Sequence, residues 1–69
     1  MDVRSPAVGK VLRMAVEDGA RVERGQELMV IESMKVEIPV KANASGTVRA
    51  LRVKPGDHVA RNSVVATIE

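Results

Sequence analysis

The sequence has no cysteine and no aromatic residue, and each absence excludes a class of chemistry. Without cysteine there is no disulfide, no thiolate nucleophile and no cysteine-bound zinc. Without Phe, Tyr or Trp, the chain lacks the side chains on which small barrels stack single-stranded bases. Its 11 basic and 9 acidic residues are interspersed and give a net charge of only +2, so no basic surface compensates for the missing rings. We therefore expect no nucleic-acid partner.

Long hydrophobic runs are absent as well, so we expect no membrane span, no targeting segment and a soluble cytoplasmic chain. The 69 residues are enough for a single domain spanning 1–69. A chain of this length buries only about 60% of its unfolded surface, which leaves no volume for an enclosed catalytic cavity. His58 is the only histidine, so a metal site is not expected. The composition predicts neither catalytic residues nor an enzyme.

β-Branched residues dominate what is present, because 13 Val, 3 Ile and 2 Thr stand against only 3 Leu. Turn-forming residues interrupt the chain too often for an uninterrupted helix. They lie at 17–19, 24–25, 43–46, 54–57 and 61–63. Many short strands separated by such turns predict an all-β sandwich or barrel.

The two halves of the chain repeat one another at an offset of 37 residues, which pairs 2–32 with 39–69 without a gap. Ten of the 31 pairs are identical, including Gly9 with Gly46 and Gly19 with Gly56. We interpret the halves as two copies of one unit of about four strands, related by a quasi-two-fold axis. We expect them to pack face to face, so that each copy covers the apolar side of the other.

Both copies also change the phase of their apolar alternation at equivalent places, around 11–14 and 48–51. A one-residue shift moves every following side chain to the other face of a sheet. The pattern therefore predicts a β-bulge or a bend at each of the two sites.

Residues 33–38 belong to neither copy, and they join two strand-like segments, 28–32 and 36–40, in a tight hairpin. Two-residue hairpin turns usually need residues that accept a positive φ, such as Asn or Gly. Ser33-Met34-Lys35-Val36 supplies none of them. A turn that violates turn chemistry and exposes a methionine predicts that function has selected its side chains. The flanking Glu32 and Glu37 could be read as an acid–base pair, but a sandwich this small offers no cleft between them, so we expect them to be solvated.

The sequence resembles the biotinyl/lipoyl carrier domains over essentially its whole length. Three segments carry the resemblance: Glu32-Ser33-Met34-Lys35-Val36-Glu37-Ile38-Pro39, Gly46-Thr47-Val48 and Pro55-Gly56-Asp57-His58-Val59. The resemblance implies a flattened β-barrel of two four-stranded antiparallel sheets, with the modified lysine on a protruding hairpin opposite the termini. Residues 9–19 align with 46–56 one for one, without an insertion. There is therefore no room for the inserted β "thumb" of some carriers, and the chain resembles the short, thumbless type.

By this resemblance, Lys35 is the residue to which biotin is covalently attached. Met34 and Val36 flank it as recognition residues, with Ser33 and Glu32 beside them. Biotin carriers usually read Met-Lys-Met and lipoyl domains Asp-Lys-Ala, so Met34 favours biotin, while Val36 departs from the usual second Met. The implied partners are a biotin protein ligase, a biotin carboxylase and a carboxyltransferase, and the isolated chain is expected to be a monomer. Two alternatives stay open: a lipoyl carrier of a dehydrogenase complex, and an unmodified interaction barrel.

Overall fold

A computed structural model describes all 69 residues, which form eight β-strands and no helix. The strands are β1 (Asp2–Arg4), β2 (Gly9–Met14), β3 (Arg21–Val22), β4 (Glu27–Ser33), β5 (Val36–Lys41), β6 (Gly46–Leu51), β7 (His58–Val59) and β8 (Val64–Ile68). The structure thus contains no helix with the length and apolar character needed to span a membrane.

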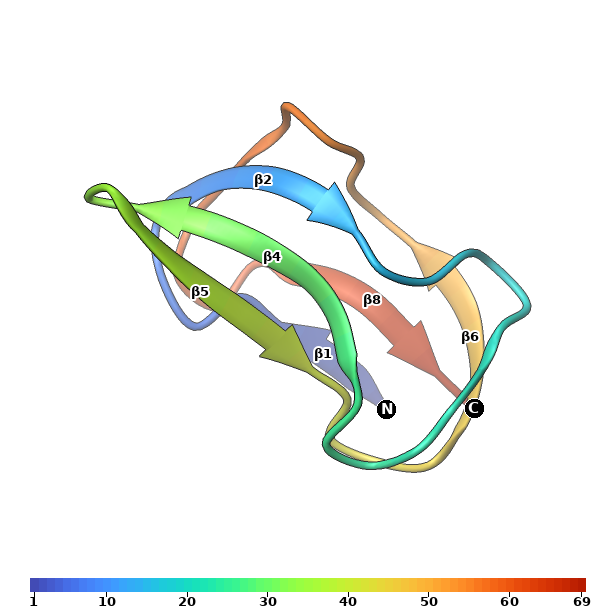
Figure 1. The fold of residues 1–69 in the computed structure, drawn as a ribbon. Helices are drawn as coiled ribbons and strands as arrows, with labels where there is room; N and C mark the ends of the chain where they lie inside the picture. Colours follow the sequence, from blue (N-terminus) through green and yellow to red (C-terminus); the bar gives the residue numbers. More distant parts are fainter.

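The strands pair antiparallel in two four-stranded sheets, with the orders β1-β8-β6-β3 and β5-β4-β2-β7. The two sheets face each other in Figure 1, where β2, β4 and β5 lie in front of β1 and β8. A single cluster of thirteen buried apolar residues, drawn from both sheets, fills the space between them. The all-β flattened barrel predicted from the sequence is confirmed.

The internal duplication is visible in the topology, because β1 to β4 of the first half correspond to β5 to β8 of the second. Exchanging each strand with its counterpart turns the order β1-β8-β6-β3 into β5-β4-β2-β7, so the quasi-two-fold relation interchanges the sheets. The expectation that each copy packs as its own layer is wrong. Each sheet contains two strands from each half. In one sheet, for example, β1 pairs with β8 and β3 pairs with β6, so strands of the first half pair with strands of the second.

The predicted bulges occur at equivalent places in both halves. The pairing of β2 with β4 shifts between Val11 and Arg13, and that of β6 with β8 shifts between Val48 and Ala50, 37 residues later. An extra residue bends a strand and strengthens its twist. The two bends help the sheets curl around a common core in so short a chain.

The turns at Gly19 and Gly56 also match, as their common position in the two copies predicts. Their φ angles are 88° and 95°, in the left-handed region that glycine enters without a steric cost. The N–H of Gly19 donates to the carbonyl oxygen of Val48 at 2.8 Å, and that of Gly56 donates to Val11 at the same distance. Each turn leads from one sheet to the other, and its hydrogen bond fastens it to the sheet that the chain then enters.

The chain ends lie together at one end of the barrel, where the Met1 ammonium donates to the carbonyl oxygen of Ile68. The β4–β5 hairpin projects from the opposite end, as Figure 1 shows. The barrel measures 31 × 18 × 18 Å along its principal axes. The fold thus presents one protruding hairpin on a compact body.

Candidate functional site

The β4–β5 hairpin is closed by a two-residue turn made of Met34 and Lys35, since Ser33 and Val36 form the last pair of the ladder. Its second strand, β5, is an edge strand and contains Pro39, which has no N–H to donate and is tolerated where one side of a strand is unpaired. The predicted hairpin, with Lys35 at its tip, is confirmed.

The turn adopts a conformation that its residues disfavour. Met34 has a φ of 52° and Lys35 a φ of 66°, so both central residues are left-handed, as a type I′ turn requires. The left-handed region costs a residue with a Cβ about 1–2 kcal/mol. The mismatch seen in the sequence is therefore a real strain in the folded chain, and it lies at the tip of the hairpin.

The side chains of the turn project into solvent. Lys35 is exposed, and its amine belongs to neither of the two ion pairs in the structure. Met34 is 94% exposed and Val36 is 58% exposed. An exposed primary amine between two exposed apolar side chains can be reached from several directions by the active site of another protein.

The carboxylates beside the turn are exposed to solvent. Glu32 and Glu37 are cross-strand partners, and both are exposed. Glu37 accepts a hydrogen bond from Arg13 at 3.3 Å, in an ion pair whose side chains are about 60% exposed. Ser33 is half-buried at the base of the turn. These residues are arranged as the solvated face of a sheet, as expected from the sequence.

The base of the hairpin rests closely on β2. A Cβ on Gly9 would overlap the carbonyl oxygen of Glu32 and lie 2.7 Å from Cγ2 of Ile31. Gly46 stands in the same relation to Glu69 and Ile68 in the second half. The glycine at position 9 therefore allows the backbone of β2 to support β4 just below the turn.

Sequence reasoning missed an apolar residue at this end of the barrel. Val8, 67% exposed, directly precedes Gly9 at the start of β2. Because Lys10 pairs with Glu32, the start of β2 lies beside the base of the hairpin. The duplication offered a signal, since the equivalent residue in the second copy is the polar Ser45.

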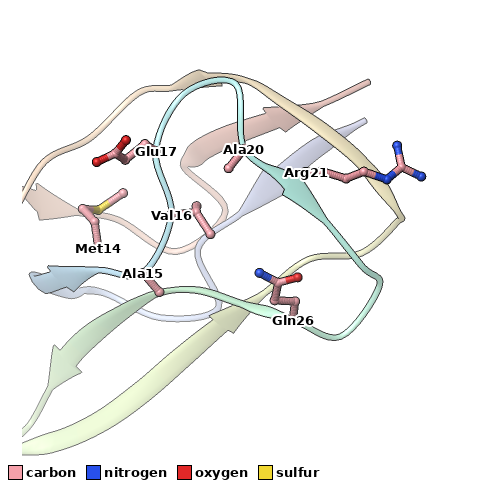
Figure 2. Close-up of a pocket in the computed structure, with 7 residues that line it drawn as sticks. All are labelled: Met14, Ala15, Val16, Glu17, Ala20, Arg21 and Gln26. Atoms are coloured by element: carbon pink, nitrogen blue, oxygen red, sulfur yellow. The ribbon is translucent and has the colours of Figure 1, made fainter.

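The largest groove of the protein is elsewhere. It has a volume of about 530 Å³ and is open to solvent, and Figure 2 shows its lining residues: Met14, Ala15, Val16, Glu17, Ala20, Arg21 and Gln26. Met14, at the end of β2, pairs with Met29, several residues along β4 from the turn. Arg21 extends away from the other lining side chains in Figure 2. The second groove is lined by residues at an offset of 37 from five of these, so the pair reflects the duplication.

The structure places no three His, Asp or Glu side chains together as a metal centre would require. His58 is exposed on β7 and pairs with Lys10 across the sheet. The candidate site is therefore the Met34–Lys35 turn itself.

The strain of the turn predicts the response to Met34→Asn. Asn accepts a left-handed φ more readily than Met, and the exposed Met34 side chain has little packing to lose. We expect the free energy of unfolding to rise by about 0.5–1 kcal/mol in urea titrations. Met34→Leu, which keeps the unfavourable backbone preference, should leave it unchanged. Equal stabilities for the Asn and Leu variants would contradict the strain.

Comparisons with known proteins agree with this geometry. Residues 1–69 match the family described as "Biotin-requiring enzyme". The chain is 43% identical over 67 residues to methylcrotonoyl-CoA carboxylase subunit alpha of Oryza sativa subsp. japonica, covering 97% of this chain but only 9% of that one. It is 39% identical to the biotinylated protein TB7.3 homolog of Mycobacterium leprae, covering 97% of this chain and 94% of that protein.

The fold is similar to that of a solved lipoyl domain. The solution structure of the lipoyl domain of the 2-oxoglutarate dehydrogenase complex from Azotobacter vinelandii matches with a TM-score of 0.82 and 25% identity. The match covers all of this chain and 95% of that domain. The architecture is thus shared by biotin-related and lipoyl-related proteins, and the residues of the turn have to distinguish them.

Proposed function

We propose that this chain, which belongs to the biotin/lipoyl attachment domain family, carries biotin covalently on Lys35. The observation that carries the proposal is the turn: Lys35 projects from a strained two-residue tip, next to a methionine that is 94% exposed. A turn built for stability would have Asn or Gly at these two positions. Selection for an accessible amine with an apolar neighbour accounts for the departure.

The attachment step needs only a neutral amine from this chain. The Nζ atom of Lys35 attacks the carbonyl carbon of a biotinyl adenylate; the new C–N bond forms, the C–O bond to AMP breaks, and the nitrogen loses a proton. Only a neutral amine can act as the nucleophile, so the reaction needs a base that accepts the proton lost by the nitrogen. No carboxylate is paired with Lys35 in the structure. We therefore assign the base to the biotin protein ligase.

The residues of the chain fit the group they are proposed to hold, because an amide-linked cofactor needs an accessible amine and no enclosing pocket. When attached, biotin supplies a ring nitrogen that accepts and releases a carboxyl group. The barrel contributes a compact body with the hairpin at one end. A long flexible link from Lys35 then gives a high effective concentration at each of two successive active sites.

Carboxylase relatives support the proposed partners. Since the chain is similar to part of a methylcrotonoyl-CoA carboxylase subunit, we propose that it serves a biotin carboxylase and a carboxyltransferase. Its role is then that of a carrier, with both catalytic centres on other domains or proteins. Met34 and Val36 are proposed to contact the ligase, with Ser33 and Glu32 beside them.

A lipoyl group is the second candidate, because the solved lipoyl domain shares the fold. Met34 distinguishes the two candidates: it places an exposed apolar side chain next to the lysine, where lipoyl domains usually have an aspartate. A ligase surface that fits an apolar methionine would bind an aspartate at this position poorly, because the carboxylate would have to be desolvated.

The two groups can be distinguished by intact-mass spectrometry of the purified chain after incubation with ATP and either biotin plus a biotin protein ligase or lipoate plus a lipoate ligase. We expect the mass to rise by one biotinyl group in the first reaction and to remain unchanged in the second. The same reactions without ligase are the control. Addition of a lipoyl group alone would support the second candidate, and no change in either reaction would indicate an unmodified interaction barrel.

A further inference from the structure

The four methionines of the chain differ sharply in their exposure to solvent. Met34 is 94% exposed and Met1 is 67% exposed, whereas Met29 is fully buried in the core. Met14 is partly buried and packs against the same core. Since the sequence contains no Cys, Trp or Tyr, thioethers are its main targets for mild oxidants. Oxidation of the folded protein should therefore begin at its exposed methionines, and Met34 is the more exposed of the two.

We propose that Met34 is a redox modification site, at which a peroxide converts the thioether to a sulfoxide and so weakens attachment at the neighbouring Lys35. The inference rests on the proposed function of Lys35 and adds a form of regulation to that site. In the reaction, the O–O bond of hydrogen peroxide breaks and one oxygen forms an S–O bond, while the other leaves as water. Sulfur is oxidised by two electrons and the peroxide is reduced by two. Methionine sulfoxide reductases reverse the change.

The position of Met34 makes the effect local. With 94% of the residue in solvent, a sulfoxide there displaces no packed atom and leaves the core intact. The same change at Met29 would put a polar group among buried side chains, where it disrupts packing. The barrel thus protects the methionine that the fold needs and exposes the one beside the attachment site.

The turn places Met34 where its oxidation can affect attachment at Lys35. Met34 and Lys35 occupy the two central positions of one turn, so their backbones are held together by the hairpin. A surface that receives Lys35 must also approach Met34. Methionine offers that surface a flexible apolar side chain, whereas the sulfoxide offers a polar group that must be desolvated.

The first test treats the folded, unmodified chain with limiting hydrogen peroxide and maps the oxidised methionines by peptide mass spectrometry. We expect Met34 and Met1 to be oxidised well before Met14 and Met29. Oxidation of Met29 as fast as Met34 would overturn the proposal, because exposure would then not control the reaction.

The second test compares rates of biotin labelling by a biotin protein ligase before oxidation, after oxidation and after treatment with methionine sulfoxide reductases. We expect oxidation to lower the rate about tenfold and the reductases to restore it. The control is Met34→Leu, which keeps Met1 and an apolar side chain at position 34. Its rate, whatever the starting value, should be the same before and after peroxide.

The outcomes separate this inference from the proposed function. If the unoxidised chain takes no biotin, the proposed function fails, and an effect of oxidation on labelling fails with it. If the unoxidised chain is labelled and the oxidised chain is labelled equally fast, only the inference fails. It also fails if Met34→Leu loses its rate after peroxide, because another methionine would then be responsible.

Discussion

Lys35→Arg is expected to abolish biotin labelling completely and to leave the thermal unfolding curve unchanged. Arginine keeps the positive charge but has no amine that can act as a nucleophile at neutral pH. The exposed side chain at the tip of the hairpin contributes little to stability, and the backbone at position 35 is left-handed with either residue. Intact-mass spectrometry after incubation with a biotin protein ligase and biotin measures the labelling.

The other lysines provide matched controls for this prediction. Lys10, Lys41 and Lys54 are also exposed, so Lys41→Arg should be labelled as well as the parent chain. Exchanging Met34 and Lys35 keeps the composition and the net charge but moves the amine by one residue. Because neighbouring residues of a hairpin direct their side chains differently, we expect the exchanged chain to lose labelling too. A single biotin on Lys35→Arg would show that the site has been assigned to the wrong lysine.

Gly9→Ala is expected to be the most damaging small change in the fold. The new Cβ would overlap the carbonyl oxygen of Glu32, which belongs to the β4 backbone and cannot rotate away as a side chain would. Overpacking of this kind costs about 1–3 kcal/mol, and a chain of this length is stable by only about 3–10 kcal/mol. Urea titrations followed by far-UV circular dichroism should show that the free energy of unfolding falls by about 3 kcal/mol. Gly46→Ala should behave alike, since its Cβ would overlap the carbonyl oxygen of Glu69.

Gly19→Ala is the control for the chemistry of this substitution. No atom lies within 4 Å of a Cβ at position 19, so the added methyl group meets no neighbour. The cost comes only from its φ of 88° and should be about 1–2 kcal/mol. Gly9→Ala should therefore be the less stable of the two. The reverse order would mean that β2 and β4 can separate at the base of the hairpin without loss.

The candidate site lies on a segment that the duplication leaves outside both copies. Three structural features of the first half recur 37 residues later: the bulge, the left-handed turn at Gly19 and the close approach at Gly9. Residues 33–38 lie between the two copies, 2–32 and 39–69, and belong to neither. The tip of the hairpin therefore lies outside the repeat.

Several features were accessible from the sequence alone because they depend on composition, on the internal repeat or on residues that are neighbours in the chain. β-Branched composition and frequent turn residues determined that the chain forms short strands. The offset of 37 determined the equivalence of the halves, and the phase changes near 11–14 and 48–51 located both bulges. The absence of Asn and Gly from the 34–35 turn indicated the candidate site, because turn chemistry is local.

Other features depended on contacts between distant residues, and only the tertiary structure decided them. Apolar alternation shows which face of a strand is buried but not which strand lies beside it, so the mixing of the two halves in each sheet could not be read from the pattern. The overlap that a Cβ at Gly9 would have with Glu32 arises from the pairing of β2 with β4. The ion pair of Arg13 with Glu37 joins two strands that are not adjacent in the sheet.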